Sequence, residues 1–412
     1  MEKRSMNDET TASNRLMGAT HILKKLCNAG YETYFAGGCV RDRLLGEEPI
    51  EYDIATAASP DEIKLVFPRA KGVGESFGVM LVRRNDVTYD VASFREDGPY
   101  SDNRHPDKIQ FGTSENDAHR RDFTINGIFY DPIEDKYHDF VGGEEDIKNK
   151  LIRAIKNPSE RIAEDHLRML RAVRFAARFS FSIESETEIA IKKMSHGLSG
   201  ISKDRIGEEV QKMLTHKNRG LAISLLQELG LDQSILNETN ARTELNRVKR
   251  LPQNATYATA IAAWIIDRHS IKNSGGDVVQ QWREQLMLTN KERDSVNEIL
   301  KLVQQLLRWK EMDIPGRKRT AASIECKSAM DIVGIEDSVL QNEIQSEIAE
   351  LEKTELAPKR LISGHDLLEA GVKPSAAMGE LIESVYDAQL KGTIKTKNDA
   401  IELALTIYQD SH

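Results

Sequence analysis

The stretch from Phe35 to Ala58, FAGGCVRDRLLGEEPIEYDIATAA, decides how the rest of the chain is organised. Its pattern predicts a strand end, a Gly-Gly turn, a short helix and a second strand. Gly37 and Gly38 let the backbone turn tightly and leave room for a bulky anion. The helix predicted from Val40 to Leu45 points its free N–H groups back at this turn, which makes an anion site.

Charged side chains in this stretch supply the chemistry. Arg41 adds a fixed positive charge suited to phosphate. Glu51 and Asp53 are two residues apart, so on a strand both carboxylates leave the same face. A Gly-Gly turn or a pair of acids alone is usually just a turn or a solvated strand end. The combination at this spacing resembles the nucleotidyltransferase signature and indicates Mg²⁺-assisted nucleotidyl transfer.

The composition is that of an ordinary globular protein. At 412 residues, 39% apolar and 30% charged, the chain can bury a large core in two or more domains. The net charge of −9 means that any nucleic-acid contact must come from local basic patches. Three widely spaced cysteines form no metal pattern and fit a reduced, cytoplasmic setting. No apolar run predicts a signal peptide or a membrane span, so no membrane partner is expected.

The first third of the chain predicts an α/β head. Residues 1–14 are polar and are expected to be disordered, and a helix is predicted from Leu16 to Asn28. Strands are predicted over 31–36, 50–55, 78–82 and 87–94. Asp90, on the last of these, shares a face with Thr88 and Ala92 in a period of two. It is a candidate third catalytic carboxylate, although a lone strand Asp is as often simply solvated.

Two further segments of the head carry charged side chains. The polar loop Glu96–Gln110 is longer than an ordinary connection and is a candidate functional segment. Arg120, Arg121 and Asp122 then lead into a strand predicted from Phe123 to Tyr130. Tandem arginines at a strand entrance suit contact with a phosphate or a ribose.

From residue 144 onward the sequence predicts almost only helices. One helix after Asn157-Pro158 carries Asp165, Arg168 and Arg171 at a spacing of three, followed by Arg174. A solvated, salt-bridged helix face is the alternative explanation for this pattern. Basic stretches over 192–219 and 308–319 are plausible contacts for a phosphate backbone.

The chain carries five motifs whose order resembles that of the class II tRNA nucleotidyltransferases, which are CCA-adding enzymes and bacterial poly(A) polymerases. The motifs are AGGCVRDRLLG, IEYDIAT, RRDFTIN, DFVGGEEDIKNKLIRAI and EDHLRMLRAVRFAARF. The resemblance implies an α+β protein: a nucleotidyltransferase head with a mixed sheet, followed by an all-helical neck, body and tail. The implied bounds are 15–143 for the head, 144–225 for the neck, 226–360 for the body and 361–412 for the tail.

The resemblance also implies roles for single residues. Glu51 and Asp53 would hold Mg²⁺, with Asp90 as the candidate third carboxylate. Asp165 and Arg168 would read the Watson–Crick edge of the incoming base, since together they offer acceptors and donors. Nucleotide binding is assigned to Gly37, Gly38, Arg41, Arg121, Asp122, Asp165, Arg168, Arg171 and Arg174.

The implied reaction adds C, C and A to the tRNA 3′ end from CTP and ATP, with contacts to the acceptor stem. An A-adding enzyme or a poly(A) polymerase is the alternative within the family. The family's first metal ligand is normally Asp, whereas this chain has Glu51, which raises a third possibility: a tRNA-binding protein with weakened catalysis. The full-length loop from Arg95 to Gln110 favours addition of the terminal A, because a loop at the pocket edge can act as a lever for the switch from C to A.

Overall fold

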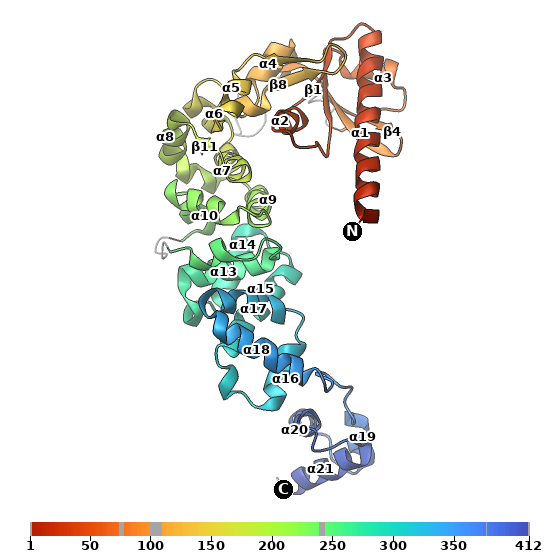
Figure 1. The fold of residues 1–412 in the computed structure, drawn as a ribbon, viewed down its shortest axis with the longest axis vertical. Helices are drawn as coiled ribbons and strands as arrows, with labels where there is room; N and C mark the ends of the chain where they lie inside the picture. The colour runs from red at the N-terminus through yellow and green to blue at the C-terminus, as the bar shows by residue number, and fades with distance from the viewer. Residues whose placement is uncertain (1, 74–77, 99–108, 239–243, 376, 411–412) are drawn as a thin grey trace. The chain divides into compact units, whose positions relative to one another are not determined.

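The computed structural model describes residues 2–73, 78–98, 109–238, 244–375 and 377–410. The chain divides into two units, Met1–Thr239 and Asn240–His412, and each is described by itself (Figure 1). The loop residues 99–108, on which the expected lever for A addition falls, lie outside the described residues.

The first unit contains a seven-stranded sheet in the order β3-β4-β5-β2-β1-β8-β9. The parallel pair β2–β5 lies among antiparallel neighbours, so the predicted mixed sheet is confirmed. The strands are β1 Thr33–Ala36, β2 Asp53–Thr56, β3 Lys71–Gly72, β4 Val79–Arg84, β5 Val87–Ser93, β8 Ile128–Asp131 and β9 Lys136–Asp139. The expected polar loop is framed at its base by a separate antiparallel pair, β6 Arg95–Asp97 and β7 Ile109–Phe111.

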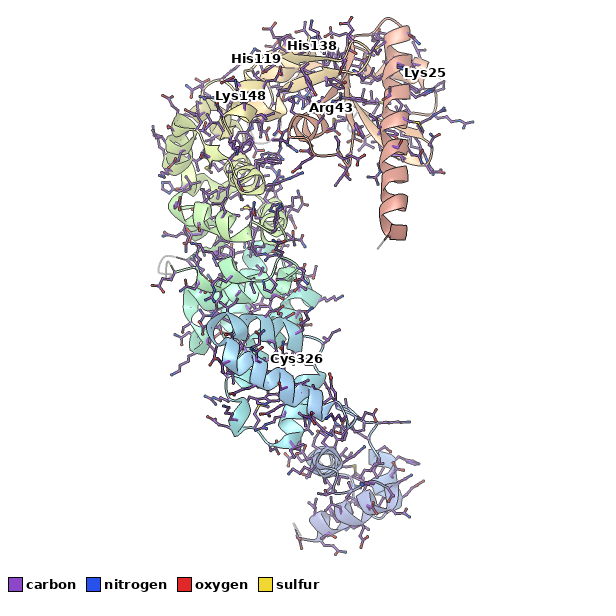
Figure 2. The ribbon with its side chains drawn as sticks, viewed as in Figure 1. Lys25, Arg43, His119, His138, Lys148 and Cys326 are labelled. Atoms are coloured by element: carbon purple, nitrogen blue, oxygen red, sulfur yellow. The ribbon has the colours of Figure 1, made fainter. Side chains whose placement is uncertain are left out.

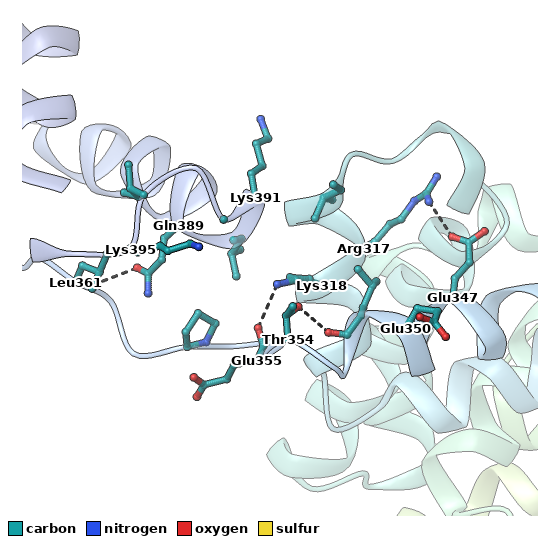
Figure 3. Close-up of a pocket in the computed structure, with 16 residues that line it drawn as sticks. Arg317, Lys318, Glu347, Glu350, Thr354, Glu355, Leu361, Gln389, Lys391 and Lys395 are labelled. Atoms are coloured by element: carbon teal, nitrogen blue, oxygen red, sulfur yellow. Dashed lines mark hydrogen bonds and ion pairs between the residues drawn. The ribbon is translucent and has the colours of Figure 1, made fainter. Parts of the chain in front are cut away.

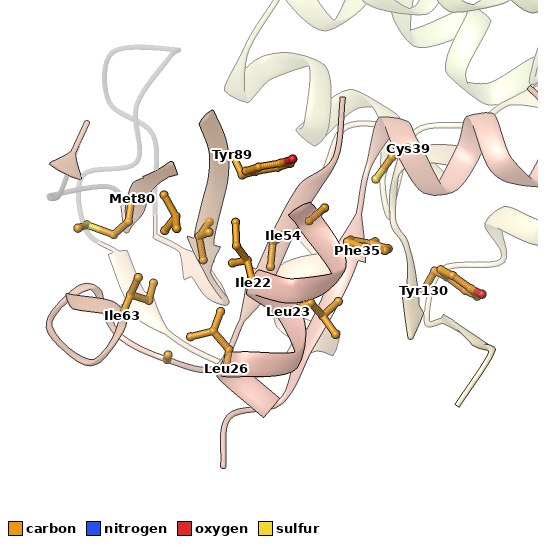
Figure 4. Packing of buried hydrophobic residues seen from close by; sticks show 14 of the residues in the cluster. Ile22, Leu23, Leu26, Phe35, Cys39, Ile54, Ile63, Met80, Tyr89 and Tyr130 are labelled. Carbon is orange, nitrogen blue, oxygen red and sulfur yellow. The ribbon is translucent and has the colours of Figure 1, made fainter. Parts of the chain in front are cut away.

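Helix α1, Glu2–Asn28, covers one face of this sheet. Its side chains Ile22, Leu23 and Leu26 are fully buried against Ile54 and Tyr89 of the strands (Figure 4). The helix begins at Glu2, and the expectation of disorder over residues 1–14 stays a prediction. The segment before Gly18 has no Gly or Pro, and adding a turn to an already packed helix avoids the cost of nucleation.

Helix α2, Gly38–Leu44, follows β1 directly, as predicted. Gly37 caps it with φ at 69°, a conformation in which glycine alone is unstrained. Arg43 on α2 donates to the Tyr130 hydroxyl at 3.0 Å, and its guanidinium lies 4.4 Å from the centre of that ring (Figure 2). These contacts hold the Gly-Gly turn and its helix against β8.

The rest of the first unit is mainly helical, as predicted, with one short parallel pair, β10 Leu151–Ile152 and β11 Ser182–Ile183. The sequence predicts one continuous helix through Asp165, and this is wrong: Asp165 is extended, with φ −154° and ψ 102°, and separates two helices. The helices are α3 Pro60–Val66, α4 Ser114–His119, α5 Gly143–Lys148, α6 Pro158–Glu164, α7 Leu167–Phe179, α8 Ser185–Met194, α9 Lys203–Leu214, α10 Arg219–Glu228 and α11 Leu231–Leu236.

The second unit is helical throughout its described residues, as predicted. Its core contains the three tryptophans of the chain, Trp264, Trp282 and Trp309, all fully buried. None of the helices that the structure describes is long and apolar enough to cross a membrane. The main helices are α13 Tyr257–His269, α14 Gly276–Leu286, α15 Asn290–Leu306, α16 Ile314–Ala322, α17 Cys326–Glu336, α18 Ser338–Leu351, α20 Met378–Lys391 and α21 Lys397–Asp410, with shorter α12 Asn246–Arg250 and α19 Gly364–Glu369.

Candidate active site

Three carboxylates meet at one end of the parallel strand pair. Ile54 of β2 pairs with Val91 of β5, so Asp53 and Asp90, one position earlier on each strand, are neighbours. Glu51 precedes β2 instead of lying on it, which corrects the expectation of a strand over 50–55. All three nevertheless line one cavity of about 310 Å³. The structure therefore brings together the three acids that the sequence singled out.

The pKa of Asp53 is raised by its surroundings at this site. Partial burial raises the pKa of Asp53, and the negative charges of Asp90 and Glu51 raise it further, while Arg121 acts in the opposite direction. Within the described part of the chain, the side chains of the three acids make no hydrogen bond or ion pair. Because a divalent cation would relieve this repulsion, and carboxylate oxygens are the donors that hard cations prefer, the residues fit a metal ion.

The carboxylates supply only part of a metal coordination shell. Among the described residues, no group of three or more acidic, His or Cys side chains already surrounds one metal position. Mg²⁺ is commonly held by one or two carboxylates, with substrate phosphates and water completing the shell. The geometry thus suits a metal that arrives with a nucleotide.

The predicted phosphate turn lies directly beside the acids. A Cβ on Gly37 would stand 3.1 Å from Nη1 of Arg121 and 3.7 Å from Oδ2 of Asp53. Arg121 is fixed there because it donates to Asp117 at 2.8 Å and to the Asn126 carbonyl at 3.3 Å. A nucleotide phosphate between the turn and Asp53 would meet this guanidinium.

Arg41 is buried, with 4% of its surface exposed. Its Nη1 donates to Asn126 at 2.6 Å, and two of its other nitrogens donate to Asp42. The guanidinium lies over the rings of Phe175 and Phe179 at 5.2 and 4.8 Å. These contacts tie α2 to α7, and phosphate binding by Arg41 stays a prediction.

Asp122 orients an arginine. Burial works to raise its pKa, but the guanidinium of Arg171 and a hydrogen bond from Asn126 outweigh burial and hold the pKa well below the usual range. Nε and Nη2 of Arg171 donate to one oxygen of Asp122 at 2.8 and 2.7 Å, while Asn126 and the Phe123 amide donate to the other. Direct contact of Asp122 with a nucleotide stays a prediction.

The predicted base-reading pair is held by separate partners. The Asp165 carboxylate accepts from the Leu167 amide at 3.0 Å and from Arg205 at 2.6 Å. Arg168 donates to Glu164 at 2.6 Å. The two side chains are therefore fixed independently, one on each side of the break between α6 and α7.

Nε of Arg174 donates a hydrogen bond to the Glu209 carboxylate at 2.6 Å. Glu209 was not predicted from the sequence, and Arg205 was predicted only as part of the basic stretch 192–219; the two lie four residues apart on α9 and so share a helix face. Asn126, which contacts both Arg41 and Asp122, was not predicted either. The only sequence signal of Glu209 is a charged residue within a helix, which most often marks a solvated face, and Asn126 is an uncharged residue at the end of the RRDFTIN motif.

A larger cavity, of about 610 Å³, lies in the second unit beside α16 and the turn between α20 and α21 (Figure 3). Arg317 pairs there with Glu347 at 2.8 Å, and Lys318 donates to the Glu355 carbonyl at 3.3 Å. Its walls carry charges of both signs: Glu347, Glu350 and Glu355 line it together with arginine and lysine side chains.

The mixed sheet, the glycine turn and the clustered carboxylates define a nucleotidyltransferase. Residues 33–153 match the poly A polymerase head domain, and residues 180–242 match the probable RNA and SrmB-binding site of polymerase A. The CCA-adding enzyme of Ligilactobacillus salivarius is 34% identical over 394 residues, which cover 91% of this chain and 92% of the relative. The enzyme of Enterococcus faecalis is 33% identical, with 95% and 96% covered. The chain belongs to the CCA-adding enzyme family of class II tRNA nucleotidyltransferases, and enzymes of this type use a divalent metal.

Solved structures agree with this assignment. The Bacillus stearothermophilus CCA-adding enzyme in complex with CTP superposes with a TM-score of 0.80 at 25% identity, covering 96% of this chain and 99% of that one. The Thermotoga maritima enzyme complexed with tRNA shares the fold, with a TM-score of 0.69 at 20% identity and 97% and 98% covered.

Proposed function

We propose that this protein adds C, C and A to the 3′ end of tRNA from CTP and ATP, without a nucleic-acid template, and releases pyrophosphate. The observation that carries the proposal is the cavity where Glu51, Asp53 and Asp90 meet, in a chain that matches CCA-adding enzymes over nearly its whole length. The protein would act in the cytoplasm, because its three cysteines are free and a reducing compartment keeps thiols in that state.

In the proposed mechanism, Glu51 and Asp53 hold Mg²⁺, and Asp90, whose charge already acts on Asp53, is the third catalytic carboxylate. When bound, the ion would supply Lewis-acid activation of the 3′-hydroxyl and neutralise phosphate charge. The Gly37-Gly38 turn and Arg121 lie beside these acids and would receive the triphosphate.

The helices next to the head would select and orient the nucleotide. Asp165 and Arg168 would pair with the base edge, where fixed donors and acceptors favour cytosine and adenine. Arg171 and Arg174 would contact the triphosphate, since Asp122 and Glu209 already fix their directions. The proposed division into a head (15–143), a neck (144–225), a body (226–360) and a tail (361–412) assigns all of these groups to the head and the neck.

An A-adding enzyme or a poly(A) polymerase is the second candidate. The observation that favours this second candidate is that the matched head domain is named after poly A polymerase. Both alternatives use the same carboxylates, so the head geometry alone does not separate them.

One incorporation assay separates these functions. A tRNA ending at the discriminator base is incubated with Mg²⁺ and labelled CTP, with and without ATP, and a second tRNA ending in CC receives ATP only. We expect both to be completed to CCA. Addition of A only to the tRNA ending in CC would support the A-adding enzyme, and long A tails would support the polymerase. Asp53→Ala, which should bind tRNA but incorporate nothing, is the control for a contaminating activity.

A further inference from the structure

Arg15 of α1 reaches the edge of the cavity that holds the three carboxylates. Its Nη1 donates a 2.7 Å hydrogen bond to the carbonyl of Ile50, the residue before Glu51. Its own carbonyl accepts from the Tyr89 hydroxyl at 3.0 Å, and Tyr89 is the residue before Asp90. One residue of α1 thus contacts the direct neighbours of two of the three acids.

The segment 48–52, which carries Glu51, has few other attachments. It precedes β2 and makes no ladder bonds. Within the part of the chain that the structure describes, the bond from Arg15 is the only hydrogen bond to this segment. The segment is also held by apolar packing: Pro49 is buried, and the Tyr52 ring packs on Phe35 with 5.4 Å between ring centres. Arg15 is therefore the polar anchor of the segment, and a hydrogen bond from a charged donor is a strong one.

The position of Arg15 is fixed by a close approach of α1 to β5. Gly18, one turn further along α1, lies so close to Tyr89 that a Cβ on Gly18 would stand 2.2 Å from the Tyr89 hydroxyl oxygen. Tyr89 is buried in the core of the head. A glycine is required at this contact, and it holds the helix where the Arg15 side chain can reach Ile50.

We propose that Arg15 is a positioning residue for Glu51. By holding the backbone of segment 48–52, Arg15 keeps the Glu51 carboxylate where it can share a divalent cation with Asp53. A glutamate has one more rotatable bond than an aspartate, so a fixed backbone removes part of the freedom that would weaken metal binding. The inference rests on the proposed function for the reaction, but metal binding is measurable without tRNA or nucleotide.

The test is a titration with Mn²⁺ alone, followed by electron paramagnetic resonance, on the full chain. Arg15→Ala should raise the Mn²⁺ dissociation constant about tenfold, the effect of losing one hydrogen bond to a charged group. Arg15→Lys should recover part of the affinity, because an ammonium group can donate to the same carbonyl. Lys24→Ala, which removes an exposed charge from the same helix, should leave the affinity unchanged.

A double-mutant cycle tells positioning from general destabilisation. In Glu51→Gln, where the charged ligand is gone, Arg15→Ala should cause little further loss of Mn²⁺ affinity. An unchanged affinity in Arg15→Ala, or a full tenfold loss on top of Glu51→Gln, would overturn the inference. Loss of Mn²⁺ affinity in Arg15→Ala, together with a wild-type protein that adds no nucleotide to tRNA, would support the inference and overturn the proposed reaction.

Discussion

Removal of the Asp122 carboxylate should destabilise the first unit measurably. Asp122 is 11% exposed and Arg171 35% exposed, and the pair is joined by two hydrogen bonds. Breaking a fully buried pair by removing one partner costs about 3–5 kcal/mol. Because Arg171 keeps contact with water, we expect about 2–3 kcal/mol for Asp122→Ala. At about 2–4 °C per kcal/mol for a unit of this size, the Tm should fall by roughly 4–12 °C.

The assay is thermal unfolding followed by circular dichroism between pH 8 and pH 3. Since the folded-state pKa of Asp122 is lowered, its stabilisation is present above the unfolded-state pKa of about 3.9 and is lost as the pH falls through the folded-state value. The difference in Tm between wild type and Asp122→Ala should therefore be constant from pH 8 to about pH 5 and should narrow below about pH 4.

A cycle with Arg171→Ala isolates the pair from other losses at either residue. We expect a coupling free energy above about 1 kcal/mol. The double variant should lose less stability than the sum of the losses in the two single variants. A coupling below about 0.5 kcal/mol, or a difference in Tm that does not change with pH, would refute the reasoning.

Three further predictions concern the active site. Asp53→Asn should abolish incorporation of labelled CTP, yet it should raise the Tm of the metal-free protein at pH 7, because burial and then the charges of Asp90 and Glu51 raise the pKa of Asp53, and an uncharged amide avoids both costs; a lowered Tm would contradict this. Asp165→Ala should lose about tenfold to hundredfold in preference for CTP and ATP over UTP and GTP in single-nucleotide incorporation assays, and unchanged selectivity would exclude the base-reading role. Deletion of residues 99–105 should leave CC addition and stop A addition on a gel, so normal completion to CCA would rule out the lever.

The part of the site that was predictable from the sequence is the part formed by residues of the right chemical type at a short, regular spacing. Gly37 lies next to Asp53, and Asp90 joins them, because strand periodicity and turn chemistry are local properties of the sequence. The exact start of β2 was not predictable. The strand begins at Asp53, and residues 49–52 before it make no ladder bonds. Hydrophobic patterning does not locate that limit.

The partners of the arginines were not predictable for a different reason. Asn126 and Glu209 lie 85 and 35 residues from the arginines they contact, and only the tertiary fold brings them together. The extended backbone of Asp165 was missed because its neighbours favour a helix, while the bond from the Leu167 amide rewards a new helix start.

The burial of Arg41 against the rings of Phe175 and Phe179 has a consequence for how this chain can change. The guanidinium joins α2 and the Gly-Gly turn to α7, so a substitution of Arg41 would affect both elements at once. Glu51 lies outside that constraint, on segment 48–52, which is held by the bond from Arg15 and by the packing of Pro49 and Tyr52. Because that backbone is held, a change in side-chain length at Glu51 moves the carboxylate alone and leaves the contacts of Arg41 undisturbed.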